Sequence, residues 1–91
     1  MMSRAHILVS GVVQGVFFRH NTMKKANEFD VKGWVRNLHD GKVEIVCEGK
    51  KDAVQKLADW CKKGPMGAYV SNVDMTWEDY TGEFDTFQIT Y

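Results

Sequence analysis

The chain has 91 residues, of which 44% are hydrophobic and 26% charged, and this globular composition argues against a long disordered tract. A chain of this length supports one hydrophobic core and excludes two independent domains, so we expect residues 1–91 to form a single domain. Lys plus Arg number 12 and Asp plus Glu also number 12, which removes any general attraction to nucleic acid or to an acidic membrane surface. Any bound anion must therefore be held locally.

The first half of the chain predicts a strand, a helix and a hairpin. Residues 5–12 are rich in Ile, Leu and Val and predict a strand, which is followed by a loop containing glycine. Residues 19–30 contain neither Pro nor Gly and predict a helix, because apolar and small side chains recur there at intervals of three or four. Residues 31–37 and 42–48 are β-prone runs on either side of an Asp-Gly turn, which predicts an antiparallel hairpin.

The second half predicts another helix and two more strands. Val54, Leu57, Ala58 and Cys61 follow the i, i+3, i+4, i+7 spacing of an amphipathic helix, with Asp52 as the expected cap and Gly64-Pro65 as the stop. Residues 71–78 and 87–91 alternate as strands do. The order β-α-β-β-α-β plus a C-terminal edge strand predicts an α+β, ferredoxin-like split βαβ sandwich with an antiparallel sheet and both helices on one face.

The cysteines and histidines give no sign of a metal site. Cys47 and Cys61 lack the close spacing typical of zinc ligands, and His6, His20 and His39 are scattered over different predicted elements. The apolar stretch at residues 5–13 is interrupted by polar side chains and lacks a small-residue cleavage site. We therefore expect a cytoplasmic protein with two reduced thiols, no bound metal and no cofactor.

The loop that leads into the first helix is the strongest candidate for a binding site. Residues 11–19, GVVQGVFFR, leave a strand, turn at glycine and enter a helix, whose start exposes unpaired backbone N–H groups. The positive charge of Arg19 is unfavourable beside the positive end of a helix. A bound anion would offset both the guanidinium and the helix end. By spacing alone this signal is weak, and a solvent-facing Arg19 is the simpler interpretation.

A resemblance to a known family favours an Arg19 that binds an anion. Residues 11–19 resemble the acylphosphatase signature G-x-V-Q-G-V-x-F-R, and GWVRN at 33–37 with DG-x-VE at 40–44 resembles the second signature of that family. The similarity continues through Glu48-Gly49, Gly64-Pro65 and the terminal F-x-I-x-Y at residues 87–91. Phe17 is a departure, because many family members carry glycine there, and it predicts a change in loop mobility or in acyl-group preference.

The resemblance implies an enzyme that hydrolyses acyl phosphates to a carboxylate and inorganic phosphate. It implies that Arg19 holds the phosphate and that Asn37 orients the attacking water. It also implies that the phosphate accepts hydrogen bonds from the backbone amides of the loop, which belong to Gln14, Gly15, Val16, Phe17, Phe18 and Arg19. The expected partners are a small-molecule acyl phosphate and inorganic phosphate as product and competing ligand, with no nucleic acid, no membrane and a monomeric protein.

This chemistry needs few side chains. Phosphoryl transfer passes through a loose transition state, so the water needs positioning and the equatorial oxygens need positive partners. The conjugate acid of the leaving carboxylate has a pKa of about 4. The carboxylate can therefore depart without protonation by a general acid. Asn37 can orient water without a charge that would repel the phosphate.

Two other classes of function fit the same architecture. The first is a binding module that keeps the anion cradle without turnover, which an assay on an acyl phosphate would reveal. The second is an RNA-recognition module, which needs aromatic side chains on the central strands within a basic face. The net charge of zero and the lack of an aromatic-rich run on those strands argue against it.

Overall fold

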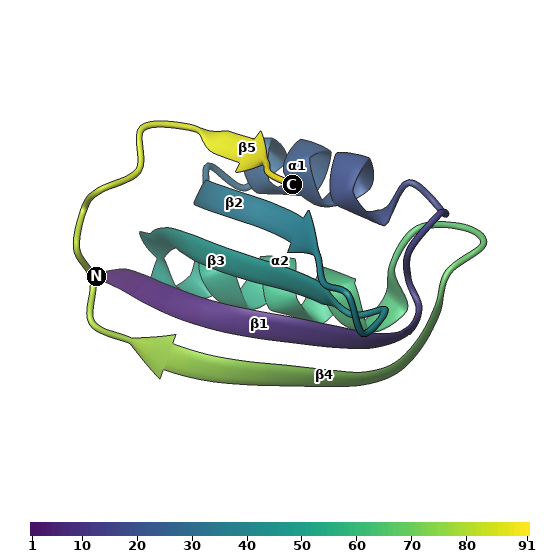
Figure 1. Cartoon of the computed structure of the whole chain (residues 1–91). Helices are drawn as coiled ribbons and strands as arrows, with labels where there is room; N and C mark the ends of the chain where they lie inside the picture. The colour runs from purple at the N-terminus through teal and green to yellow at the C-terminus, as the bar shows by residue number, and fades with distance from the viewer.

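A computed structural model describes residues 1–91 and places them in seven elements (Figure 1). In chain order these are β1 (Met2–Val12), α1 (Phe18–Glu28), β2 (Lys32–Asn37), β3 (Val43–Lys50), α2 (Lys51–Lys63), β4 (Tyr69–Glu78) and β5 (Phe87–Ile89). The five strands form one sheet in the order β4-β1-β3-β2-β5, and both helices pack on one of its faces (Figure 1). The predicted α+β sandwich and its element order are confirmed.

One strand pair differs from the antiparallel sheet that we predicted. β5 runs parallel to β2, with Gly33 opposite Phe87 and Val35 opposite Ile89, whereas the other three pairs are antiparallel. The reason is topological, because β4 ends at the end of the sheet where β2 begins. Residues 79–86 cross to the far edge at that end, so β5 sets out in the direction of β2 (Figure 1). As a result β1, β2 and β5 all finish at the end of the sheet where α1 begins.

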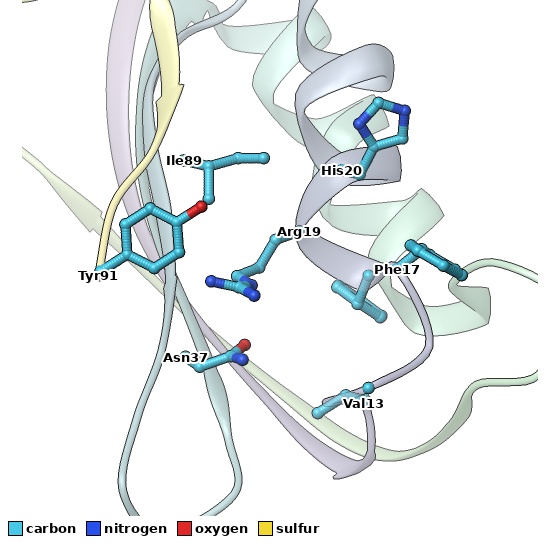
Figure 2. Close-up of a pocket in the computed structure, with 9 residues that line it drawn as sticks. Val13, Phe17, Arg19, His20, Asn37, Ile89 and Tyr91 are labelled. Atoms are coloured by element: carbon cyan, nitrogen blue, oxygen red, sulfur yellow. The ribbon is translucent and has the colours of Figure 1, made fainter.

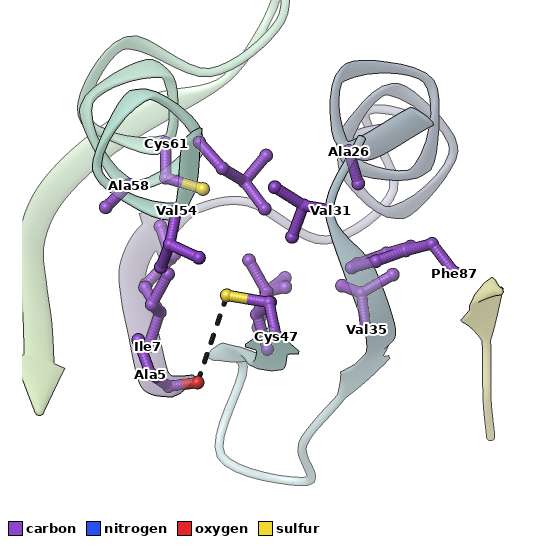
Figure 3. Close-up of a cluster of buried hydrophobic side chains, with 14 of the residues drawn as sticks. Ala5, Ile7, Ala26, Val31, Val35, Cys47, Val54, Ala58, Cys61 and Phe87 are labelled. Carbon is purple, nitrogen blue, oxygen red and sulfur yellow. Dashed lines mark hydrogen bonds between the residues drawn. The ribbon is translucent and has the colours of Figure 1, made fainter. Parts of the chain in front are cut away.

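The core lies between the sheet and the two helices. Ala5, Ile7 and Val9 alternate along β1 and are fully buried against the helices. Val54, Leu57, Ala58 and Cys61 meet them from α2, as the helical spacing predicted (Figure 3). Each fully buried aliphatic side chain of this kind stabilises the fold by about 1.5–3 kcal/mol.

Both cysteines belong to this core and are free thiols. The Cys47 Sγ atom donates to the Ala5 carbonyl oxygen at 3.9 Å (Figure 3). Burial raises the pKa of Cys47 to about 12 and raises the pKa of Cys61 further. Neither thiol is therefore ionised at neutral pH, and both behave as small apolar side chains.

Gly33 sets how closely β2 approaches β3. Its φ is 143°, and a Cβ atom added there would lie 2.0 Å from the Val46 carbonyl oxygen. No other residue fits this contact without moving the backbone. Gly33 thereby pins a register in which it lies opposite Cys47, Val35 opposite Ile45 and Asn37 opposite Val43.

The start of α2 differs from the prediction. Lys50 occupies the N-cap position and no side chain caps the helix, so the expected cap by Asp52 is wrong. Asp52 lies two residues later, in the first turn, where its carboxylate accepts a hydrogen bond from the Ala53 amide at 2.9 Å and places negative charge at the positive helix end. The end of the helix is as predicted, with Gly64 at φ 71°.

Neither helix combines the length and the apolar character needed to cross a bilayer.

A buried carboxylate on the opposite face of the sheet holds the crossing segment 79–86. Glu48 is 2% exposed and accepts hydrogen bonds from the Thr81 amide at 2.8 Å, the Gly82 amide at 3.1 Å and the Arg4 guanidinium at 3.2 Å. Burial alone would raise the pKa of Glu48, but the hydrogen bonds from Thr81 and Arg4 outweigh it and lower that pKa below the ordinary value of 4.5. The charged form of Glu48 therefore stabilises the fold.

We predict that Glu48→Gln lowers the free energy of unfolding by about 1–3 kcal/mol at pH 7, since hydrogen bonds to a charged group are lost. Because the pKa is lower in the folded state than in the unfolded one, the contribution of Glu48 is fully present above about pH 5 and fades as the pH falls through the folded-state pKa. Urea denaturation of both proteins between pH 7 and pH 3 checks this. Glu28→Gln, which alters only the exposed Lys25–Glu28 pair, is the control and should change stability by less than about 0.5 kcal/mol. A difference between wild type and Glu48→Gln that is constant with pH would contradict the assignment.

Candidate active site

The loop between β1 and α1 has a backbone suited to holding an anion. Gly15 has φ 77° and Phe17 has φ 59°, while Val16 between them does not have a positive φ. Such alternation turns successive N–H groups towards one concave side, as in known anion-binding loops. Phe17 is also the N-cap residue of α1, so the loop runs directly into the positive end of the helix.

The backbone amides of this loop are available to a ligand. The amides of Gln14, Gly15, Val16 and Phe17 donate to no protein acceptor. Those of the next residues lie in the first turn of α1, where no intrahelical acceptor exists, and the first bond of the helix runs from Asn21 N to Phe17 O at 3.0 Å. No side chain caps this helix and no acidic residue lies in its first turn. These donors therefore present an uncompensated positive end to an incoming anion.

Arg19 differs from the other two arginines of the chain. Arg4 forms ion pairs with three glutamates, and Arg36 forms one with Glu44 at 2.6 Å. Arg19 has no carboxylate within 4.0 Å, and its guanidinium instead lies over the Tyr91 ring, 5.1 Å from the ring centroid. A cation stacked on an aromatic face keeps its N–H groups free for an anion.

Asn37 carries an unsatisfied polar atom beside Arg19. It is the last residue of β2, and its side chain lies on the helix side of the sheet because it continues the alternation of Gly33 and Val35. Its Oδ1 atom is buried and accepts no hydrogen bond within the protein. Figure 2 shows the side chains of Asn37 and Arg19 directed towards each other across the cavity. A buried acceptor of this kind costs about 1–3 kcal/mol unless a donor reaches it.

These groups line one cavity of about 230 Å³. Its walls are formed by Val13, Gly15, Phe17, Phe18, Arg19, His20, Asn37, Ile89 and Tyr91 (Figure 2). A shallower depression adjoins it, shares Arg19, Asn37 and Tyr91 with it, and is completed by Gln14, Leu38 and His39. No Asp or Glu side chain lines either hollow, whereas the cationic side chain of Arg19 lines both. No group of three or more His, Cys, Asp or Glu side chains is arranged to hold a metal ion.

The structure brings together most of the residues that the sequence pointed to. Gly15, Phe17, Phe18, Arg19 and Asn37 all line the cavity, whereas Val16 packs against the core. Gln14 lines only the adjoining depression.

Four residues that line the cavity were not predicted as site residues, namely Val13, His20, Ile89 and Tyr91. Ile89 and Tyr91 belong to the terminal F-x-I-x-Y that resembles the family, but only the parallel pairing of β5 with β2 brings them beside Arg19. Asp40 behaves as the predicted turn residue, since its Oδ1 accepts from the Lys42 amide at 3.1 Å.

The acylphosphatase family model matches residues 5–89. The chain belongs to the acylphosphatase family. It is 55% identical over 91 residues to the acylphosphatase of Syntrophus aciditrophicus, covering 100% of this chain and 95% of that one. The crystal structure of acylphosphatase from Bacillus subtilis superposes with a TM-score of 0.94 at 34% identity and full coverage of both chains. An acylphosphatase from Coxiella burnetii gives a TM-score of 0.88 at 42% identity, covering 98% of this chain and 93% of that chain.

The protein is thus an acylphosphatase, which hydrolyses the carboxyl-phosphate bond of acyl phosphates to a carboxylate and inorganic phosphate. The family that the signatures at residues 11–19 and 33–44 indicated is thus confirmed, and the match covers nearly the whole chain. An acylphosphatase must bind a dianionic group without trapping it. A cavity with an unpaired arginine and no Asp or Glu side chain is suited to that task.

Phe17 is the strained residue of the acylphosphatase loop. A bulky aromatic side chain at φ 59° is rare, since the left-handed conformation costs a residue other than glycine about 1–2 kcal/mol. Its side chain is 79% exposed, so little burial offsets that cost. The carbonyl oxygen of Phe17 accepts from both the Asn21 amide and the Asn21 Nδ2 atom, which hold the conformation in place. The surrounding structure therefore maintains the strained conformation.

We predict that Phe17→Gly raises the free energy of unfolding by up to about 1 kcal/mol and leaves phosphate affinity within about twofold. Glycine removes the left-handed strain of about 1–2 kcal/mol, offset in part by its own entropic cost of about 0.5–1 kcal/mol. Phe17→Val, which is β-branched, should lower stability instead. Chemical denaturation and calorimetric titration with phosphate measure both quantities. Equal losses of stability in the two variants would show that the exposed ring, and not the backbone, matters.

Proposed function

We propose that Arg19 and the loop amides of residues 14–19 hold the phosphoryl group and that Asn37 orients the water that attacks it in line. The observation that supports this most directly is the buried, unpartnered Asn37 Oδ1 atom beside an arginine without a carboxylate partner. One group lacks a donor and the other lacks an anion. A phosphate with an attacking water supplies both.

The phosphate is neutralised by donors that need little rearrangement. The planar fork of Arg19 can pair two phosphate oxygens at once, and the amides of the loop serve the remaining oxygen. In a loose transition state the charge lies on the equatorial oxygens, where these donors act most strongly. The cation–π contact with Tyr91 restricts the guanidinium before substrate arrives.

Asn37 accepts one hydrogen bond from the water through Oδ1 and leaves the lone pair of the water directed at phosphorus. A carboxylate in its place would repel the phosphoryl oxygens. Holding the water at attack distance converts an encounter with solvent into a local step. The bond from water oxygen to phosphorus forms while the bond from phosphorus to the acyl oxygen breaks. The electron pair leaves with the carboxylate, and the proton of the water passes to solvent or to the phosphate product.

We also propose that the protein acts as one cytoplasmic domain and as a monomer, with inorganic phosphate as product and competing ligand. We expect no metal, no cofactor, no nucleic acid and no membrane to take part. The balanced charge of the chain and its two buried free thiols support this description. Light scattering of the purified protein and turnover after chelation test its two sharpest statements.

We predict that phosphate stabilises the wild type and that this effect disappears in Arg19→Gln. A ligand at about 100 times its dissociation constant stabilises the native state by roughly 2.7 kcal/mol. Thermal melts with and without phosphate measure the shift, with sulfate at equal ionic strength as a reference. The matched control is Arg36→Gln, which removes an arginine on the other face and should keep the shift. An equal shift in wild type and Arg19→Gln would place the anion elsewhere.

We predict that Asn37→Ala lowers kcat by about 10²–10³ while phosphate affinity stays within about threefold, since one preorganised polar contact is lost only at the transition state. Arg19→Lys should differ by weakening phosphate binding and turnover together, because a point charge does not replace the fork. Calorimetry with phosphate and steady-state hydrolysis of an acyl phosphate measure both quantities. If Asn37→Ala loses phosphate binding but keeps kcat, the two roles are reversed.

A further inference from the structure

The side chain of Gln14 leaves the phosphate loop and reaches the β2–β3 turn. Its Nε2 atom donates to the Leu38 carbonyl oxygen at 2.7 Å and to the Lys42 carbonyl oxygen at 2.9 Å. Leu38 follows Asn37 directly in the chain. The same Lys42 carbonyl oxygen also accepts a hydrogen bond from the Leu38 amide at 2.8 Å, and this bond closes the turn. Gln14 therefore binds both residues that close the turn.

No other hydrogen bond joins residues 13–17 to residues 38–42. The first segment follows β1 and the second joins β2 to β3, so neither lies in a strand. They do not pair in the sheet, since β1 and β3 pair only as far as Val9 and Val43. The relative position of the phosphate loop and the end of β2 therefore depends on this one side chain and on the core beneath it.

The chemistry of an amide suits this contact closely. A glutamine NH₂ group has two neutral donors, and here both are used on carbonyl oxygens. A glutamate of the same length would bring a carboxylate against two carbonyl oxygens, with no donor at all. The side chain is half-buried, so water replaces these bonds less readily than on an open surface.

We propose that Gln14 is a positioning residue that fixes Asn37 relative to the phosphate loop. The inference rests on the proposed roles of Arg19 and Asn37. The loop carries the phosphorus atom and Asn37 carries the water, so the reaction distance is set by how these two segments are joined. A displacement on the order of 1 Å at an attack distance can cost about 100-fold in rate. Gln14 acts at that joint without touching substrate through its side chain.

The first test replaces Gln14 by methionine, which keeps the length and removes both donors. We expect kcat for an acyl phosphate to fall about 10- to 100-fold, while phosphate affinity changes no more than about threefold. The matched control is Gln55→Met on α2, where a single exposed bond of 3.0 Å to Asp59 is lost and kcat should not change. Thermal melts confirm folding at the assay temperature. A kcat within twofold of wild type for Gln14→Met would overturn the proposal.

The second test is a double-mutant cycle with Asn37→Ala. If Gln14 acts through Asn37, the double variant should be no slower than Asn37→Ala alone, because a group that is absent cannot be misplaced. Effects that multiply would mean that Gln14 acts on something else, and they would overturn the proposal. If Asn37→Ala itself keeps full activity, the assigned role of Asn37 fails, and this outcome is distinct from a failure of the inference about Gln14.

Gln14→Glu gives a readout that a purely structural role would not move. The carboxylate form should be slower than Gln14→Met, because it repels the two carbonyl oxygens. Protonation restores one donor, so the ratio of its kcat to that of wild type should rise at least about threefold as the pH falls from 7 to 5. A ratio that stays constant with pH would contradict the hydrogen-bond role.

Discussion

The register of β2 against β3 is the constraint on which the site depends. Side chains alternate between the two faces of a strand, so a shift of one residue would turn Asn37 to the open face and bring Arg36 to the cavity side. The close approach at Gly33, where an added Cβ would meet the Val46 carbonyl oxygen at 2.0 Å, admits one alignment only. A glycine four residues before Asn37 thus decides which side chain of β2 faces the loop between β1 and α1.

The sheet also separates the charges of the protein. Arg4 and Arg36 lie on the face without helices and are held there by glutamates, whereas Arg19 stands on the other side without one. Burial alone would raise the pKa of Glu44, but hydrogen bonds from His6 and Arg36 lower it, so Glu44 stays charged and holds Arg36. A chain with no net charge can therefore present a positive cavity. An anion that enters the cavity would meet local fields and not an overall charge.

Much of the fold followed from periodicity. The helical spacing of residues 54–61 and the Asp-Gly turn at 40–41 located elements that the structure contains. The direction of β5 could not be predicted, because it depends on where residues 79–86 cross the sheet and not on the three residues of the strand. Asp52 was misplaced as a cap for a similar reason. Any acidic residue near a helix start suits the dipole, and only the backbone decides which residue is the N-cap.

Part of the candidate site, like part of the fold, could be predicted from the sequence, and part could not. Residues adjacent in the chain, such as Gly15 and Arg19, were located by the signature, and Asn37 by a second one. Their roles stay predictions. Gln14 was predicted only as a backbone donor, and the contacts of its side chain were not predicted. Its partners lie 24 and 28 positions away, and only the folded chain brings them together. Tyr91 belonged to the terminal F-x-I-x-Y of the resemblance, but its stacking on Arg19 was not predicted, since it depends on the path of the chain beyond β5.

The parallel strand β5 places one wall of the cavity at the edge of the sheet. It comprises three residues, lies at the sheet edge and pairs with β2 alone, while the sheet interior is held by the much longer β1 and β3. Short edge elements exchange between closed and open forms at a free energy well below that of global unfolding. We therefore expect the side of the cavity that bears Ile89 and Tyr91 to open at a lower free energy than the interior of the sheet.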